Sequence, residues 1–511
     1  MDFLINNARL VDCHKKKIFI GGVAVVESRI VEVYNDRSSI PIDHFDRVID
    51  AKGKYLIPAF FDVHSKSDLS AIGDPSRISA LSQGIAVEVL GHDGFSVAPV
   101  SHKNYMLHSQ YVSSGLGNPQ LKWKWESVFQ YLDNLNLKTA TNTLFYSPHG
   151  TMRLECSLNP VLSAAGLSAL QYVFERSIDD GAIGLSISVS QSPSSVGWND
   201  DKELEVLLKV LQQKDGILCV NVEGSKNHLK DIDKAINLAR NYGIRLHISR
   251  LTPNNSEQLD AMLSILDRRK KDAKALIVDV SPYPSRLLRL HDVIPESIKG
   301  FSSEELRVRF KKQENVRALF AELKYNEAEL ETLKLVTTSK RDMKKYEEVN
   351  VETIAMEKDE TIYELMLDLI VSDSEKTFFE HEVIKPETLK KAFELPFVLP
   401  ATTGYLNGRY LPDMFSTVQT YFSIFSKKDI CDLVLKLAQV PADFYGIKWD
   451  IKRGSRSNFI LMDDENFHSE ATYADPRIAP SGVELVVVNG KIASEKGKTT
   501  GTRTGEVLSW I

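Results

Sequence analysis

The segment LIPAFFDVHSKSD, which runs from Leu56 to Asp68, carries the clearest structural signal in the sequence. Its apolar half is typical of a buried strand, and the run ends at the polar residues His64, Ser65 and Lys66. Residues two apart in a strand project from the same side, so His64 and Lys66 are predicted to point the same way. In a parallel α/β barrel they would point into the mouth at the carboxyl ends of the strands, where such barrels keep their active sites.

Strand-like runs and amphipathic helical stretches alternate through the middle of the chain. The strand-like runs are Ile85–Leu90, Thr143–Tyr146, Ala182–Ser188, Ile217–Val222, Arg245–Ile248, Ala275–Val280 and Phe397–Leu399. The helical patterns between them include Leu167–Ile178, Glu203–Gln213 and Leu229–Tyr242. Repeated strand–helix units favour a parallel α/β fold. Their number and length fit a (β/α)8 barrel better than an open sheet, although the period alone does not separate the two.

Both ends of the chain have the pattern of β structure. Phe3–Val11 and Ile18–Val33 hold β-branched runs with polar breaks, and Asn489-Gly490 joins two strand-like runs as a hairpin turn. We therefore predict one small β-sandwich domain from residues 1–56 and 446–511, and a barrel from residues 57–445. A charged helical insertion, rich in Glu, Lys, Arg and Leu, interrupts the barrel at about residues 295–358.

Composition and charge restrict the class of protein. Of the 511 residues, 43% are hydrophobic and 26% are charged, and the formal net charge of -6 gives no indication of nucleic acid or an anionic membrane surface as a partner. The cysteines, Cys13, Cys156, Cys219 and Cys431, are too scattered to suggest a disulfide framework. Because neither a signal peptide nor an apolar run of about 20 residues is present, a cytoplasmic protein is expected.

Four further segments carry a family resemblance. They are VEVLGHDGFSVAP (Val87–Pro99), SPHGTMR (Ser147–Arg153), GAIGLSISVSQSP (Gly181–Pro193) and VELVVVNGKIASEKGKTTGTRTGEVL (Val483–Leu508). With the first segment they resemble the N-acyl-D-amino-acid deacylases, or D-aminoacylases, of the amidohydrolase superfamily, from about Phe3 to Leu508. The resemblance implies a (β/α)8 TIM-like barrel with a small β-sandwich from both termini. It also implies hydrolysis of a non-peptide C–N amide bond by a bound divalent metal, usually zinc.

The metal-ligand positions implied by the resemblance hold mostly unsuitable side chains. His64 and Asp93 remain plausible ligands, whereas Lys66 stands where a second histidine would follow His64. Two later strands should each supply a histidine and carry Asn221 and Arg250 instead. Lys66 and Arg250 are cationic at neutral pH and would repel a dication. The sequence therefore predicts a degenerate metal site without a cofactor.

Other side chains near the mouth offer a replacement for the missing ligands. Ala401 stands at the general-base position, so the sequence indicates no catalytic residue. The candidates for a rescued site are His92, His149, Glu223 and Asp279. The alternative to a metal-free site is one Zn²⁺ held by His64 and Asp93 together with His149 or Glu223. His247 lies three residues before Arg250, so strand alternation predicts that it faces the opposite way.

The leading hypothesis is a catalytically impaired amidohydrolase-like protein, a pseudoenzyme, that binds an N-acyl amino acid or another small carboxylate. The side chains predicted to bind this ligand are Lys66, His149, Arg153, Arg250 and Arg409. An active amidohydrolase with an atypical single-metal site is the alternative. In a third interpretation, the charged insertion is the contact surface of a homo-oligomer. Lys66 and Arg250 would instead be internal struts if each pairs with a carboxylate such as Asp93 or Asp62.

Overall fold

The structure is a computed structural model that describes residues 2–13, 15–35, 44–117, 121–157, 159, 161–294, 301–309, 327–402, 404–406, 409–425 and 430–509. The chain forms two compact units. The barrel unit comprises Met1–Pro282, Glu387–Ala471 and Arg477–Ile511, and the insertion unit comprises Tyr283–Pro386 and Thr472–Pro476. None of the helices in the described ranges combines the length and the apolar character needed to cross a membrane.

The barrel unit is built around parallel strands that occupy eight positions among the described residues. They are β6 (Phe60–Asp62), β7 (Ile85–Leu90), β8 (Asn142–Phe145) continued by β9 (Ser147–Pro148), β10 (Gly184–Ser188), β11 (Ile217–Asn221), β12 (Arg245–Ser249), β13 (Leu276–Val280) and β17 (Val398–Pro400). The barrel is joined between its last and first strands by Thr402, whose hydroxyl donates to the Asp62 carboxylate at 2.7 Å and to the His64 carbonyl oxygen at 3.1 Å. The predicted (β/α)8 barrel is confirmed.

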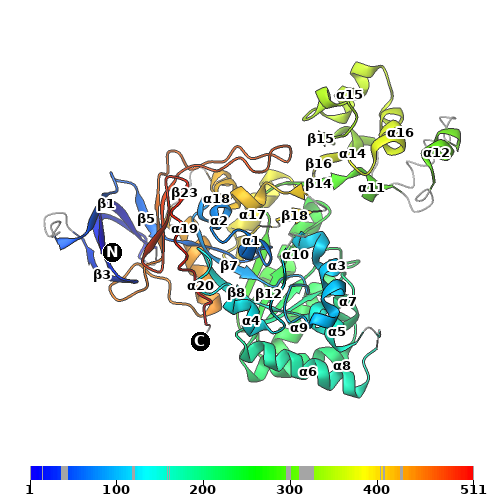
Figure 1. The fold of residues 1–511 in the computed structure, drawn as a ribbon. Helices are drawn as coiled ribbons and strands as arrows, with labels where there is room; N and C mark the ends of the chain where they lie inside the picture. The colour runs from blue at the N-terminus through cyan, green and yellow to red at the C-terminus, as the bar shows by residue number, and fades with distance from the viewer. Residues whose placement is uncertain are drawn as a thin grey trace. The chain divides into compact units, whose positions relative to one another are not determined.

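Helices follow most barrel strands and cover them (Figure 1). They are α1 (Ser70–Gly73), α2 (Ile78–Leu81), α3 (Tyr105–Leu116), α4 (Val128–Asp133), α5 (His149–Cys156), α6 (Ala164–Asp179), α7 (Ser194–Trp198), α8 (Asp201–Gln213), α9 (His228–Tyr242), α10 (Ser256–Arg269), α17 (Pro386–Glu394), α18 (Asp413–Ile424), α19 (Ile430–Val434) and α20 (Val440–Tyr445). Local sequence sets their ends. The Asn227 side chain accepts from Lys230 N to begin α9, and Gly243 ends it at φ 64°, a conformation that glycine adopts without strain.

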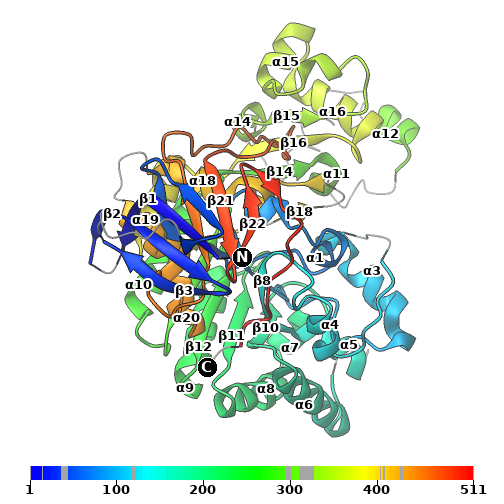
Figure 2. The ribbon, with the colours of Figure 1, turned by 60° about the vertical axis from the view of Figure 1, so that its left-hand side comes forward.

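Both termini contribute to one nine-stranded sheet, in which the blue N-terminal strands lie beside the red C-terminal ones (Figure 2). Its strands are β1 (Phe3–Asp12), β2 (Lys17–Val26), β3 (Arg29–Tyr34), β4 (Arg47–Asp50), β5 (Tyr55–Pro58), β20 (Phe459–Met462), β21 (Val483–Val488), β22 (Lys491–Glu495) and β23 (Lys498–Thr499). The two ends meet where β5 pairs with β1 on one side and β20 on the other. The Asn489-Gly490 turn has positive φ at both residues, as a type I′ hairpin requires. The predicted small β domain formed from both termini is confirmed.

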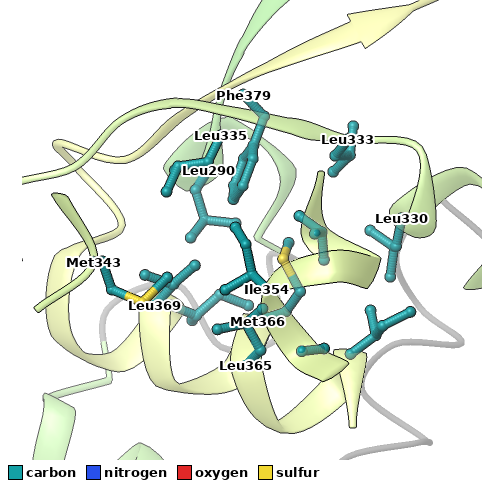
Figure 3. Packing of buried hydrophobic residues seen from close by; sticks show 14 of the residues in the cluster. Leu290, Leu330, Leu333, Leu335, Met343, Ile354, Leu365, Met366, Leu369 and Phe379 are labelled. Atoms are coloured by element: carbon teal, nitrogen blue, oxygen red, sulfur yellow. The ribbon is translucent and has the colours of Figure 1, made fainter. Parts of the chain in front are cut away.

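The insertion unit has a hydrophobic core of its own (Figure 3). Its elements are the sheet β14 (Ser285–Arg289), β16 (Phe378–Glu382) and β15 (Lys334–Thr337), and the helices α11 (Leu290–Val293), α12 (Ser303–Arg309), α14 (Glu327–Glu331), α15 (Val351–Lys358) and α16 (Ile362–Asp373). Buried side chains such as Leu335, Leu365 and Phe379 pack together inside it. Residues 295–300 and 310–326 of the insertion predicted from the sequence lie outside the described residues.

Candidate functional site

Asp93 lies at the centre of an ion-paired cluster at the mouth of the barrel. It follows β7 in a tight turn with φ 61° between two glycines that also have positive φ, and it is fully buried. Its Oδ2 accepts from Lys66 Nζ and, at 3.4 Å, from Arg250 Nη1. Burial opposes ionisation of Asp93, but the positive charges of Lys66 and His64 lower its pKa well below the usual range.

Arg250 connects this cluster to two further carboxylates. Its Nε lies 3.2 Å from Glu223 Oε2, and its backbone N–H donates to Asp279 Oδ1 at 3.0 Å. The residue has φ 51°, so the chain leaves the strand direction directly after β12. Burial lowers the pKa of the guanidinium, but the surrounding carboxylates, Glu223 first, outweigh this and raise it. The structure thus brings Lys66 and Arg250 together on Asp93.

His64 and Asp279 form the second half of the mouth. His64 Nδ1 lies 3.2 Å from both carboxylate oxygens of Asp279 and 2.9 Å from Ser249 Oγ, and its Nε2 lies 3.4 Å from Asp93 Oδ1. Burial lowers the pKa of His64, but the negative charges of Asp279 and Asp93 outweigh it and raise the pKa to about 9. The mouth is therefore a buried network in which charges of both signs alternate.

A second group of polar side chains lies one step further toward the amino ends of the strands. Cys219 on β11 is in register with His247 on β12, two residues before the pair of Asn221 and Ser249. His92 approaches both, with Nδ1 3.7 Å from Cys219 Sγ. One ligand atom from each of these three buried residues lies within 4.8 Å of the others, as a metal ion requires. We call His92, Cys219 and His247 the inner cluster.

The inward position of His247 corrects the prediction that it faces away from the site. Its Nε2 lies 2.8 Å from Asp279 Oδ2, and Ser249 two residues later contacts His64. Strand alternation therefore holds between residues 247 and 249. The prediction was wrong because it counted from Arg250, whose positive φ places it outside the strand.

The other predicted ligand-binding residues have partners elsewhere. His149 Nε2 lies 2.7 Å from Glu203 Oε1, and Arg153 Nε donates to the same oxygen at 2.9 Å. Glu203 belongs to α8, and all three side chains are fully buried. Burial opposes ionisation of Glu203, but hydrogen bonding to His149 and Arg153 lowers its pKa. Arg409 lies in the two-residue strand β19 (Arg409–Tyr410) and is half-buried.

The remaining residues from the sequence analysis, Ala401, Asn221 and Asp62, form hydrogen bonds with uncharged groups. The Ala401 N–H donates to the Val280 carbonyl oxygen at 3.2 Å, so this residue continues the barrel wall. Asn221 Oδ1 accepts from the Glu223 N–H at 2.7 Å. Asp62, an alternative partner for the cations, instead accepts from Thr402, and burial raises its pKa to about 6. Asp93 is thus the carboxylate that pairs with both cations.

Sequence reasoning missed the inner cluster, although a signal for it was present. Cys219 stands two residues before Asn221, and residues two apart in a strand share a face. If position 221 faces the barrel interior, position 219 must face it too. His92 lies in the turn just before Asp93. The direction of its side chain could therefore not be predicted from strand alternation.

No family model matches this chain. An N-acyl-D-aspartate deacylase of Alcaligenes xylosoxydans xylosoxydans is 22% identical over 99% of this chain and 95% of its own length. An N-acyl-D-glutamate deacylase of the same organism is 24% identical over 51% of this chain and 53% of its own length.

Solved structures agree with this similarity. The N-acyl-D-glutamate deacylase of Bordetella bronchiseptica, complexed with zinc and a phosphonate inhibitor, matches with a TM-score of 0.75 at 19% identity over 99% of both chains. A crystal structure of D-aminoacylase matches with a TM-score of 0.74 at 18% identity over 99% of both chains. The chain thus has the fold of the amidohydrolase superfamily. Its sequence is similar to that of the N-acyl-D-aspartate deacylase over nearly its whole length.

The comparisons also correct the expectation that the protein has no cofactor. The Bordetella deacylase holds zinc, and a D-aminoacylase with a TM-score of 0.73 to this chain, 18% identical over 99% of both chains, has a binuclear metal centre. In this chain the inner cluster is a group that can hold a metal ion. The expectation was wrong because it considered only the positions at the mouth and not the inner cluster.

Proposed function

We propose that this chain is a D-aminoacylase-like amidohydrolase in which hydrolysis is strongly reduced, and that it binds a small carboxylate at the barrel mouth. The observation that carries this proposal is the double ion pair on Asp93. Lys66 and Arg250 both lie on Oδ2 of this carboxylate, and their side chains are largely buried. A dication at Asp93 would lie against two fixed positive charges, so the mouth residues do not fit a catalytic metal.

The second half of the catalytic machinery is also replaced. Ala401 offers no carboxylate at the general-base position, and the hydroxyl of the following Thr402 is committed to Asp62 and to the backbone of His64. Loss of a general base alone costs about 10²–10⁴-fold in rate. Reduced hydrolysis therefore follows from two independent replacements.

Arg250 is the residue best suited to bind a ligand carboxylate. Its side chain is 15% exposed, and its partner Glu223 is 35% exposed. Because Glu223 is partly exposed, water screens this ion pair, so a ligand carboxylate can replace Glu223 without a large loss. The guanidinium can then form two parallel hydrogen bonds to the ligand. An N-acyl amino acid, the substrate class of the deacylase relatives, carries the required carboxylate.

Calorimetric titration with N-acetyl-D-glutamate tests this assignment. We expect wild-type protein to bind it and Arg250→Ala to bind it at least about tenfold more weakly. Glu223→Gln is the matched control, because removing the competing carboxylate should leave binding unchanged or tighter. Unchanged affinity in Arg250→Ala, or loss of binding in Glu223→Gln, would contradict the proposal.

An active hydrolase with an atypical single-metal site is the second candidate. The inner cluster favours it, because two imidazoles and a thiol form a ligand set that zinc accepts. The two candidates are separated by assaying a panel of N-acyl-D-amino acids with added zinc, cobalt or manganese. The proposed function predicts no significant turnover. Turnover that disappears in Cys219→Ala, which removes the thiol of this ligand set, would overturn it in favour of the active enzyme.

A further inference from the structure

The inner cluster lies below the ion-paired mouth, inside the barrel. Its strand residues, Cys219 and His247, come two residues before the pair Asn221 and Ser249. We propose that His92, Cys219 and His247 bind a single zinc ion there. This position differs from the mouth positions Asp93, Asn221 and Arg250, each of which lies one to three residues later in the chain. The site uses none of the groups assigned to carboxylate binding at Arg250, so the two proposals stand independently.

The spacing of the ligand atoms suits a tetrahedral ion. Zinc bonds of about 2.0–2.1 Å to nitrogen and 2.3 Å to sulfur place neighbouring ligand atoms about 3.3–3.6 Å apart. His92 Nδ1 and Cys219 Sγ are 3.7 Å apart, and the three ligand atoms all lie within 4.8 Å of one another. Rotation of the side chains by small angles closes the remaining gap. Two imidazoles with one thiolate match the ligand preferences of zinc better than those of magnesium or calcium.

The cluster also contains polar groups that the protein leaves unsatisfied. His92 is fully buried, and its Nε2 has no hydrogen-bond partner among the described residues. Its Nδ1 approaches only the weakly polar Cys219 sulfur. A buried polar atom without a partner costs roughly 1–3 kcal/mol. The ion would bind at Nδ1, the nitrogen that faces Cys219, and would replace this weak contact with a coordinate bond.

Asp279 provides the outer support that histidine ligands usually have. Its Oδ2 lies 2.8 Å from His247 Nε2, and the other ring nitrogen, Nδ1, lies 3.3 Å from the Tyr146 hydroxyl, a contact that an ion at Nδ1 would replace. A carboxylate behind a ligating histidine orients the ring and increases its basicity. Asp279 also contacts His64, whose ring stacks on His92 at 4.1 Å between centroids, so the same carboxylate contacts two rings beside the proposed ion.

An ion in this position would link three separate parts of the barrel. His92 comes from the turn after β7, Cys219 from β11 and His247 from β12. All three residues are at most 1% exposed, so substrate does not reach an ion here, and three protein ligands leave its fourth position to a small ligand such as water. The geometry therefore assigns the ion a role in holding the barrel together.

Metal analysis of the full chain, purified without chelator, tests the proposal. We expect close to one equivalent of zinc that survives dialysis in wild-type protein and in Arg250→Ala, and its loss in Cys219→Ala. Cys431→Ala is the matched control, because Cys431 is a buried cysteine on α19 outside the cluster. Substitution with cobalt should give a thiolate-to-cobalt charge-transfer band in wild type and in Cys431→Ala.

Three results would overturn the assignment. One is wild-type protein that binds neither zinc nor cobalt. Another is zinc retained in full by folded Cys219→Ala, which would place the ion elsewhere. The third is cobalt-loaded wild type without a thiolate band, a result that decides the question even if Cys219→Ala fails to fold. Loss of carboxylate binding in Arg250→Ala with zinc retained would leave this proposal intact and concern only the mouth.

Discussion

The mouth and the inner cluster are two layers of the same barrel interior, and they keep their buried polar side chains electrically balanced in opposite ways. At the mouth, Asp93 and Asp279 are ionised, and cations on neighbouring segments pair with them. In the inner cluster, burial lowers the pKa of His92 and His247 and raises that of Cys219, so these side chains are uncharged without a metal. On β11 and β12, the last strand residues, Asn221 and Ser249, lie at the mouth. The residues two positions earlier, Cys219 and His247, belong to the candidate metal site.

The difference indicates how each layer can be disrupted. The mouth is held by charges that must all be present, because removing one partner leaves the other buried and uncompensated. The inner cluster depends on an external ion and tolerates its absence at the cost of unsatisfied polar atoms. Substitutions at the mouth should therefore affect stability whether or not metal is bound.

The largest effect is expected for Asp93→Asn. Asparagine has nearly the same shape and tolerates the positive φ of this residue, so the substitution mainly removes the charge that compensates Lys66 and Arg250. The free energy of unfolding should fall by roughly 3–5 kcal/mol, as measured by urea denaturation. In the double variant Lys66→Met/Asp93→Asn part of this loss should be recovered. A change below about 0.5 kcal/mol would mean that the ion pairs do not hold the mouth.

An intermediate effect is expected from acid titration of Glu88, a buried ion pair outside both layers. Arg77 donates to both carboxylate oxygens of Glu88, at 2.9 and 2.8 Å. Burial raises the pKa of Glu88, but Arg77 outweighs this and lowers it from 4.5 to about 2. Because the folded-state pKa is depressed, the stabilisation is fully present above pH 4.5 and is lost as pH falls toward 2.

The loss should amount to about 3 kcal/mol in the free energy of unfolding. Urea denaturation of wild type and Glu88→Gln across this range measures it, and the difference between the two proteins should shrink as pH falls. A difference that stays constant down to about pH 2 would show that Glu88 does not titrate as the geometry implies. The result measures how much one buried ion pair contributes to the free energy of unfolding. This value can be compared with the loss in Asp93→Asn.

The smallest effect is expected for Glu223→Gln. Glu223 contacts the same guanidinium as Asp93 but is 35% exposed, so water screens the interaction. The free energy of unfolding should change by less than about 1 kcal/mol. Measured beside Asp93→Asn, this variant separates burial from charge, because both remove one carboxylate from Arg250. Equal losses in the two variants would contradict the distinction between the buried and the exposed part of the mouth.

Much of the fold and part of the candidate site were predictable from local sequence. The apolar runs, the turn Asn489-Gly490 and the polar ends of strands such as Asp62–Lys66 specify a barrel and a β domain, because burial and backbone preferences act over a few residues. The prediction that Lys66, Asn221, Arg250 and Ala401 stand where metal ligands and a general base would be also rests on residue identity in local motifs.

Which groups these residues meet was decided by the tertiary structure. Lys66 and Arg250 are separated by most of the barrel in sequence, yet share Asp93 because their segments converge at the mouth. His247 faces inward by strand alternation with Ser249, and Arg250 reaches the same site because its positive φ takes it out of the strand, which local pattern does not reveal. The inner cluster exists because the register of β11 against β12 brings Cys219 beside His247, and register is set by long-range strand pairing.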